Sequence, residues 1–231
     1  MNTMPSSKIS KHCSKPARTK PAKVRRDDLM NAAVSLFLKN GVAHTAIEQI
    51  TTRAQVAKGT FYLYFSSKEN ILEALGERFA EQLLAGIKAA VAEKPAHHWK
   101  EKLAAWSAAC LTGYLDSIRL HDVVFNRARS HPHTHVGLID NIIIDHLEDL
   151  LQTGTRRRAW KIEDPRFTAV YLFSALHGIV DYTVAREKRP NVPLLKKRIE
   201  HLFSRAVGLA PIRKTSVPSV LNLCSSPRQA P

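Results

Sequence analysis

The chain of 231 residues has few cysteines and no long apolar run. Its three cysteines, Cys13, Cys110 and Cys224, lie far apart, so neither a disulfide framework nor a C-x-x-C metal knuckle is expected. No stretch approaches 18 uninterrupted apolar residues, which argues against a membrane-spanning helix. No apolar segment follows the basic residues near the N-terminus, so we expect no secretory signal. These absences favour a reduced, cytoplasmic, globular protein.

Acidic residues are also scarce, with 20 Asp and Glu against 35 Lys and Arg, a formal net charge of +15. Residues 1–26 contain eight basic side chains and no acid. Such a segment buries too little apolar surface to offset its ordering entropy. We therefore expect a disordered basic arm over residues 1–22 and, because proline and serine dominate the other end, a disordered tail over residues 211–231. The charge indicates a polyanionic partner.

Between these ends, apolar residues recur at the three- and four-residue spacing of helices, and no alternation typical of strands occurs. The pattern predicts an all-α fold. Asn40-Gly41 and Gly208 are expected to end helices. The expected helices cover residues 29–40, 46–54, 58–65, 68–92, 99–118, 120–129, 136–153, 165–187 and 194–207.

Residues 41–70 contain the most informative pattern. Thr45 with Glu48 three residues later predicts a capping box at the start of a short helix. A turn of about three residues then leads to a second short helix, in which Phe61 and Phe65 share a face that can pack inward. Its other side chains would face outward, as the second helix of a helix-turn-helix requires for reading base edges in a major groove.

This block resembles the N-terminal DNA-binding region of the TetR/AcrR family of transcriptional regulators. The resemblance covers about residues 23–83 and rests on Thr45, Ile47, Ile50, Ala54, Val56, Lys58-Gly59-Thr60, Tyr62, Tyr64-Phe65, Lys68-Glu69 and Leu72. Gln55 departs from it, because it stands where the family commonly has glycine in the turn. A left-handed conformation at this residue would cost about 1 kcal/mol.

The resemblance implies a DNA-binding domain over residues 23–83 and a helical effector-binding and dimerisation domain over residues 84–210. It implies that Lys58, Thr60 and Tyr62 face the groove, while Thr45, Tyr64 and Lys68 mainly touch phosphates. Gly59 lacks a side chain, so the backbone there could approach a phosphate closely. Tyr62 and Tyr64 could instead be packing aromatics, although Phe61 and Phe65 already take the inward direction.

Three further clusters allow different interpretations. His131, His133 and His135 could bind a metal, but their alternation on a loop fixes no tetrahedral geometry, so we expect no metal and no cofactor. Ser174, His177 and Asp181 superficially suggest a nucleophile with its base, but no elbow turn accompanies them, so we do not expect an enzyme. Several aromatic and histidine side chains could line an effector pocket or be ordinary core: Trp106, Tyr114, Phe125, His146, Tyr171 and His177.

The helix expected over residues 165–187 is apolar on two sides, so it must be covered twice. Small residues on its second side and a seam on the last helix suggest a four-helix interface between two copies. The expected interface residues are Ser174, Ala175, Gly178, Leu195, Ile199, Leu202 and Phe203.

These inferences together predict a homodimeric regulator that binds a double-stranded DNA operator, and no membrane. A small apolar or aromatic effector would release a repressor of this kind from its operator. The alternative is a helical, dimeric DNA-binding protein without an effector.

Overall fold

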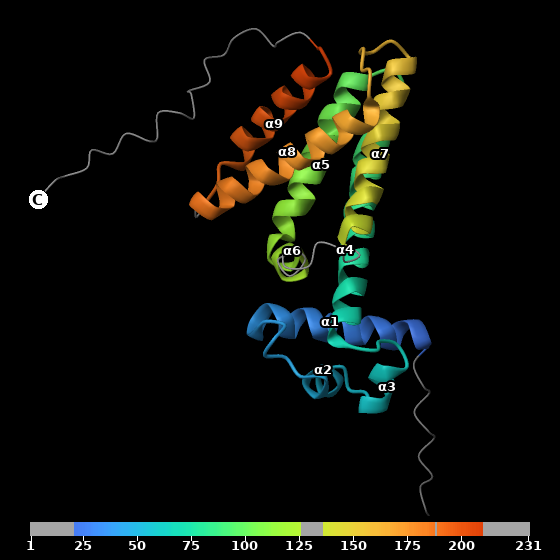
Figure 1. Cartoon of the computed structure of the whole chain (residues 1–231), viewed down its shortest axis with the longest axis vertical. Helices are drawn as coiled ribbons and strands as arrows, with labels where there is room; N and C mark the ends of the chain where they lie inside the picture. Colours follow the sequence, from blue (N-terminus) through green and yellow to red (C-terminus); the bar gives the residue numbers. More distant parts are fainter. Residues whose placement is uncertain (1–20, 126–135, 188, 210–231) are drawn as a thin grey trace, which may run out of the picture. The chain divides into compact units, whose positions relative to one another are not determined.

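The structure, a computed structural model, describes residues 21–125, 136–187 and 189–209, with the side chains of residues 125 and 136–140 excepted. Within these ranges every regular element is a helix (Figure 1). The chain divides into two compact units, residues 1–67 and residues 68–231. The expected arm over residues 1–22 and tail over residues 211–231 lie almost wholly outside the described residues. So does the His131, His133 and His135 loop.

The first unit contains three helices, α1 (Ala22–Asn40), α2 (Ile47–Arg53) and α3 (Lys58–Tyr62). Helix α1 starts earlier than the helix expected over residues 29–40, so Lys23, Arg25 and Arg26 are helical. Gly41 ends it with φ 79° and ψ 157°, a conformation that is essentially restricted to glycine. The side chains that join the three helices are fully or almost fully buried: Leu29, Met30, Phe37, Ile50, Phe61 and Phe65.

The capping box expected at Thr45 and Glu48 is wrong. Helix α2 begins after Ala46, one residue later than that box requires, and Gln49 Oε1 accepts a hydrogen bond from the Ala46 N–H at 2.9 Å. Thr45 is buried, and its hydroxyl donates backwards to the Gly41 carbonyl at 2.8 Å. A glutamine side chain therefore caps the helix, while Thr45 braces the turn before it.

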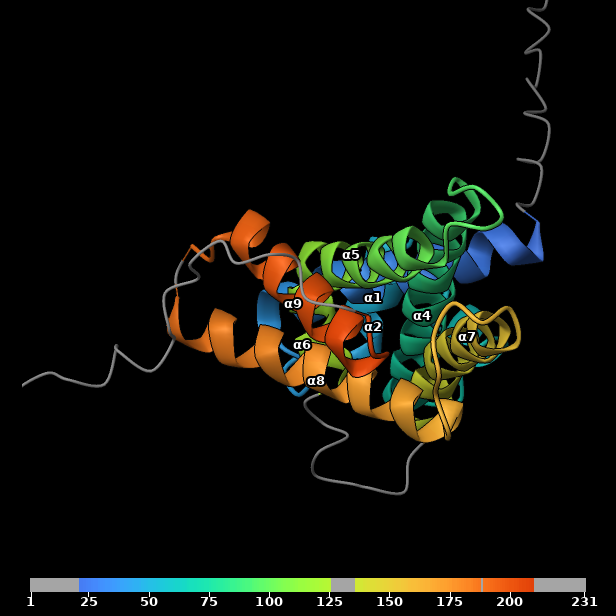
Figure 2. The same ribbon diagram turned by 90° about the horizontal axis from the view of Figure 1, so that it is seen from above.

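The second unit contains six described helices, α4 (Lys68–Ala92), α5 (Trp99–Asp116), α6 (Ile118–Phe125), α7 (Val136–Arg156), α8 (Pro165–Arg186) and α9 (Val192–Ala206). Helix α5 packs against both α4 and α9, and α7 packs against both α4 and α8. Helices α8 and α9 lie side by side (Figures 1 and 2). Asp164 and Asn191 cap the starts of α8 and α9 by accepting from backbone N–H groups at 2.8 and 3.0 Å.

The core of this unit is centred on α5. Trp106, Cys110 and Tyr114 are fully buried, and the Trp106 ring stacks on Phe203 of α9 with a centroid distance of 6.0 Å. Leu195 and Ile199 are buried in the same core. The apolar stripe of α9 is therefore covered within one chain. Leu195, Ile199 and Phe203 are core residues and not the expected dimer-interface residues.

Helix α8 has one fully covered side and one open side. Its inner stripe of Ala169, Leu172, Phe173, Leu176 and Val180 is buried, as expected. The helix is also long and apolar enough to span a membrane by length and composition, with a mean hydropathy of 1.2 over its best 18 residues. The sequence analysis argued against a membrane-spanning helix because no long uninterrupted apolar run occurs. Widely spaced polar residues interrupt such runs without lowering the average hydropathy of the helix very much. Packing of the inner stripe is the ordinary reason for such hydropathy in a globular protein.

Three helices end in the same left-handed turn. The N–H groups of Gln55, Arg158 and Gly208 donate to the carbonyl three residues back at 3.1, 3.0 and 3.0 Å. The N–H of each following residue donates five residues back at 3.0, 2.9 and 2.9 Å. This is the Schellman arrangement, with φ values of 56°, 60° and 75° at the three residues. The suspected left-handed conformation of Gln55 is therefore present, and Arg158 shares it.

We expect Gln55→Gly and Arg158→Gly to raise the free energy of unfolding by about 0.5 kcal/mol each. Relief of the left-handed strain, about 1–2 kcal/mol, exceeds the added freedom of glycine in the unfolded chain, about 0.4–1 kcal/mol. Gly208→Ala should lower the free energy of unfolding by about 1 kcal/mol for the converse reason. Urea unfolding followed by circular dichroism measures all three changes. Destabilisation by both glycine substitutions would contradict this explanation of the turns.

Candidate nucleic-acid interface

Helix α3 is short and is held by two phenylalanines. It covers Lys58 to Tyr62, and the Tyr64 and Phe65 N–H groups both donate to the Phe61 carbonyl, at 3.0 and 2.9 Å. The Phe61 and Phe65 rings are buried with centroids 5.7 Å apart, which confirms the inward direction expected for them. Their burial fixes which side of α3 faces outward.

The outward side carries the residues expected to meet a groove. The Tyr62 side chain is 52% exposed, and its ring stands edge-on to Phe61 at a centroid distance of 5.5 Å. Lys58 and Gly59 are exposed, while Thr60 and Tyr64 are partly buried. A Cβ at Gly59 would meet no atom within 4 Å, so packing inside the protein does not require glycine there. The surface thus offers a cation, a phenol and a bare stretch of backbone together.

Leu63 extends this surface and was missed by sequence reasoning. Its side chain is 76% exposed, the largest value among the exposed large apolar side chains of the described residues. Helical spacing could have identified it. Phe61 and Phe65 face inward, so the residue midway between them in the sequence faces the opposite way.

The structure places one of the expected phosphate contacts, Thr45, differently. Thr45 is 1% exposed and its hydroxyl is engaged by the Gly41 carbonyl, so the structure does not offer its side chain to a phosphate. Lys68 is the first residue of α4 and belongs to the second unit.

An ion pair joins α2 to α3. Lys58 Nζ lies against Glu48 Oε1, and both side chains are more than half exposed. The hydrogen bond with Lys58 holds the pKa of the Glu48 carboxyl below its ordinary value, and the carboxylate raises the pKa of Lys58. Glu48 is therefore a partner of the candidate groove residue and not the capping residue that the sequence suggested. In the free protein, the Lys58 charge is offset by a carboxylate.

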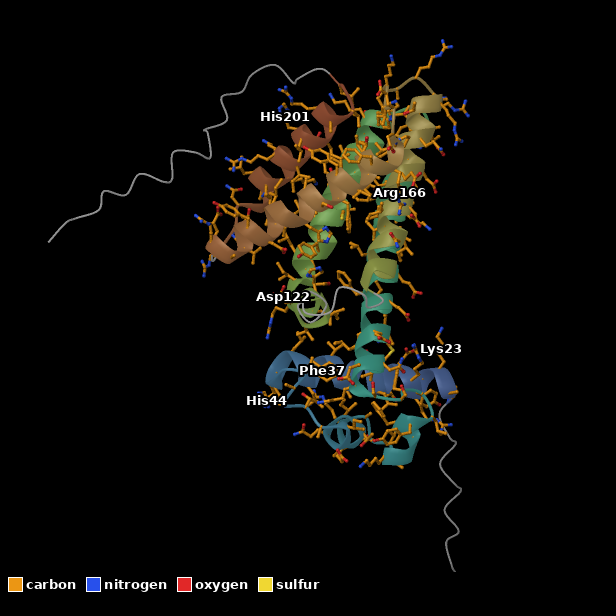
Figure 3. The ribbon with its side chains drawn as sticks, in the orientation of Figure 1. Lys23, Phe37, His44, Asp122, Arg166 and His201 are labelled. Atoms are coloured by element: carbon orange, nitrogen blue, oxygen red, sulfur yellow. The ribbon has the colours of Figure 1, made fainter. Side chains whose placement is uncertain are left out.

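Arg26, near the basic start of α1, contacts side chains of the first unit. The Arg26 guanidinium lies 5.3 Å from the centroid of the Phe65 ring, and its Nη1 donates to Met30 Sδ at 3.4 Å. Lys23 is an exposed residue of the first turn of the same helix (Figure 3). Arg26 thus helps to hold the chain after α3.

A second candidate region lies in the second unit, residues 68–231, which we call the body. Polar groups of α5, α6 and α8 meet there. The Tyr114 hydroxyl donates to Asp181 Oδ1 at 2.6 Å. The Tyr114 ring lies 4.3 Å from the ring of His121 and 4.7 Å from the ring of His177, between centroids. His177 Nδ1 is 3.2 Å from the Phe173 carbonyl, which only accepts, so Nδ1 is the donor. We call Tyr114, His121, His177 and Asp181 the polar cluster.

The polar cluster contains only two of the six expected effector-pocket residues. Trp106 and His146 form a separate pair, in which Trp106 Nε1 donates to His146 Nδ1 at 3.1 Å. Burial lowers the pKa of His146, and the charge of Lys88 lowers it further. Tyr171 is half exposed on the outer side of α8, and the side chain of Phe125 lies outside the described residues.

The described side chains can be compared with the metal-binding and catalytic arrangements that the sequence suggested. Across the described parts of the chain, no three His, Cys, Asp or Glu side chains gather closely enough to hold a metal ion. Ser174 is exposed, His177 Nδ1 is directed to the Phe173 carbonyl and Asp181 accepts from Tyr114, so these three residues do not form a nucleophile, base and orienting acid.

Comparison with known proteins bears directly on the first unit. Residues 29–75 match the family model of bacterial regulatory proteins of the tetR family. The fatty acid metabolism regulator protein of Bacillus subtilis is 37% identical over 76 residues, which make up 33% of this chain and 38% of that protein. The HTH-type transcriptional regulator TcmR of Streptomyces glaucescens is 39% identical over 62 residues, 25% of this chain and 27% of that protein. This chain therefore spans about a third of the length of the curated relatives that it matches.

Solved structures are similar over most of the chain. The fatty acid degradation regulator FadR from Bacillus halodurans superposes with a TM-score of 0.65 at 22% identity, covering 85% of this chain and all of that one. FadR from Bacillus subtilis in complex with stearoyl-CoA gives a TM-score of 0.65 at 24% identity, covering 78% and 98%. At these identities the likeness establishes the all-α fold, with a helix-turn-helix head and a helical body. Residues 29–75 thus resemble the tetR family of bacterial regulatory proteins, and the chain shares its fold with regulators of that kind.

Proposed function

We propose that the chain is a sequence-specific DNA-binding regulator of transcription whose DNA-binding region covers residues 23–83. The observation that carries the proposal is the anchoring of α3 by buried Phe61 and Phe65, which presents the opposite side of the helix outward. The excess of basic residues supplies the sequence-independent attraction to phosphates. The regulators that match this region support the assignment.

Within this proposal, Lys58, Thr60 and Tyr62 read base edges, and Leu63 adds apolar contact suited to a thymine methyl group. The backbone at Gly59, together with Tyr64 and Lys68, positions the protein on phosphates. Glu48 gives the interface selectivity, because Lys58 must exchange a carboxylate for an acceptor on the DNA.

We expect Tyr62→Ala and Lys58→Ala to weaken operator binding by about 1–3 kcal/mol each, because each removes a base contact. Binding to random-sequence DNA should change much less, since phosphate contacts position the protein without specifying sequence. Lys39→Ala removes an exposed cation from the same unit and is the matched charge control. Fluorescence anisotropy at fixed salt measures all three variants.

The companion variant Glu48→Gln should bind random-sequence DNA more tightly than the unsubstituted protein, because Lys58 loses its internal counter-charge. Equal losses on operator and random DNA for both Tyr62→Ala and Lys58→Ala would show that these residues do not read bases.

We infer that the protein acts as a homodimer through the outer side of α8. Side chains at helical spacing form an exposed, largely apolar stripe there, which we call the α8 stripe: Phe167, Val170, Tyr171, Ser174, Gly178 and Tyr182. A Cβ at Gly178 would meet no atom within 4 Å, which leaves room for a second helix to approach. Ala175 and Leu202 are both partly buried. The two-fold symmetry of a dimer matches a palindromic operator.

Gly178→Arg should give a monomer, because a long cation would enter the centre of the α8 stripe, and operator affinity should fall at least tenfold. Asp116→Arg introduces the same side chain at an exposed position of α5 and should leave the dimer intact. Size-exclusion chromatography with light scattering measures the mass, and circular dichroism checks the helix content. An unsubstituted protein that runs as a monomer at micromolar concentration yet binds its operator tightly would refute the dimer model.

We further infer that a small apolar or aromatic effector binds in the body and releases the protein from DNA, which makes it a repressor. The stearoyl-CoA complex of the Bacillus subtilis FadR supports an effector with an apolar chain. The polar cluster is suited to recognise a hydrogen-bonding group on such a molecule, since it combines a phenol, a carboxylate and two imidazoles within an apolar core. The alternative remains a dimeric DNA-binding protein without an effector.

A thermal-shift screen of apolar and aromatic compounds distinguishes these two functions, because a protein without an effector predicts no stabilising compound. We expect a compound that both stabilises the protein and lowers operator affinity. Tyr114→Phe should weaken that compound at least tenfold, since it removes the hydroxyl that donates to Asp181. Thr112→Ser, a conservative change at an exposed position on the same helix, is the control. Undiminished effector binding by Tyr114→Phe would remove the polar cluster from the proposed site.

A further inference from the structure

A cleft of about 490 Å³ lies at one end of the body, apart from the polar cluster. It forms where the segment from His97 to Glu101 at the start of α5, the turn after α7 and Leu209, three residues beyond the end of α9, come together. Trp99, Ala159 and Leu209 give it an apolar part, and His97, Lys100 and Arg157 give it a basic part. A volume of this size suits a small ligand, since ligand pockets commonly enclose about 300–1,000 Å³.

The charges in this cleft favour an anion. Lys100 and Arg157 are exposed cations, and the acid among the described lining residues, Glu101, is engaged by His98 Nδ1 at 2.9 Å. Arg157 is the middle one of three consecutive arginines at the end of α7. The third of them, Arg158, keeps a left-handed backbone conformation that glycine would adopt more easily, so the turn retains a cation at some cost. The potential around the cleft is therefore positive.

The start of α5 adds to this potential. His98 is the residue before the helix, and its side chain does not cap a backbone N–H of the first turn. Helix α5 has 18 residues and a corresponding dipole. The first amide groups of a helix carry partial positive charge and suit a phosphate or carboxylate. Two side-chain cations and a helix start thus border the same small cleft.

The apolar part of the cleft is a fixed, flat wall. Trp99 is partly buried, and Lys102 Nζ lies 5.0 Å from the centroid of its ring. This contact and the partial burial orient the indole, which limits the entropy that a stacked ligand would lose. A ligand that fits both parts of the cleft is an anion with an apolar or aromatic portion.

We propose that this cleft binds a small organic phosphate. The phosphate lies against Lys100, Arg157 and the first amides of α5, and the apolar portion of the ligand lies against Trp99. A phosphate is favoured over a carboxylate because two cations line the site and a phosphate monoester carries about −1.5 to −2 charges at neutral pH. This site goes beyond the proposed DNA-binding and effector functions and uses none of their residues.

Phenyl phosphate is the smallest probe that contains both chemical groups. Isothermal titration of the full chain should show saturable binding, with phenol and inorganic phosphate each at least tenfold weaker. Arg157→Gln and Lys100→Gln should each weaken phenyl phosphate at least tenfold. Lys197→Gln on the exposed side of α9 and Lys39→Gln in the first unit remove the same charge elsewhere and should change binding less than twofold. Each variant is checked for helix content by circular dichroism, and Lys100→Gln carries the test if Arg157→Gln does not fold.

Absence of saturable binding at millimolar phenyl phosphate would overturn the proposal. An equal loss in Lys197→Gln would also overturn it, because binding would then reflect diffuse attraction to a basic chain. Inorganic phosphate binding as tightly as phenyl phosphate would remove Trp99 from the site.

Discussion

The burial of Phe61 and Phe65 is the constraint on which the proposed DNA-binding surface depends. Helix α3 has only five residues, far fewer than an isolated helix needs in water, so its own backbone hydrogen bonds cannot hold it. Full burial of each phenylalanine contributes about 1.5–3 kcal/mol, and both rings lie on one side of the helix. The direction of Lys58 and Tyr62 follows from this packing and not from helix propensity. A short recognition element is thus made rigid by the side that never meets DNA.

The body solves the opposite problem, since it has more apolar helix surface than one chain covers. The apolar stripe of α9 is buried within the chain, because Phe203 stacks on Trp106 and Leu195 and Ile199 lie in the same core. Helix α8 uses its inner side in the same core, and its outer side stays exposed. The difference between these two helices explains why one apolar helix can serve assembly while its neighbour serves only the core.

Sequence patterns predicted the helices well because their signals are local. Gly41 and Gly208 were expected to end helices, and both do so in the structure with positive φ values. The inward direction of Phe61 and Phe65 followed from four-residue spacing. Gln55 was singled out because the family that this block resembles commonly has glycine there, and its backbone is left-handed in the structure.

The wrong predictions concern features that depend on residues far away in the sequence or on a shift of one position. Thr45 and Ala46 compete to start α2, and the burial of Thr45, which the sequence does not encode locally, decides the outcome. The covering of α9 depends on Trp106, almost a hundred residues away. The effector-pocket candidates were chosen by residue type, and the structure distributes them among the polar cluster, the Trp106–His146 pair and the outer side of α8.

The burial of Cys110 in the centre of α5 has a consequence for how the protein can be controlled. Desolvation raises the pKa of its thiol to about 12, so at neutral pH only about one molecule in 10⁵ carries the reactive thiolate. It is the free cysteine of the described residues, and it is closed off on all sides by packed side chains. The described part of the chain therefore offers oxidants no thiol to modify.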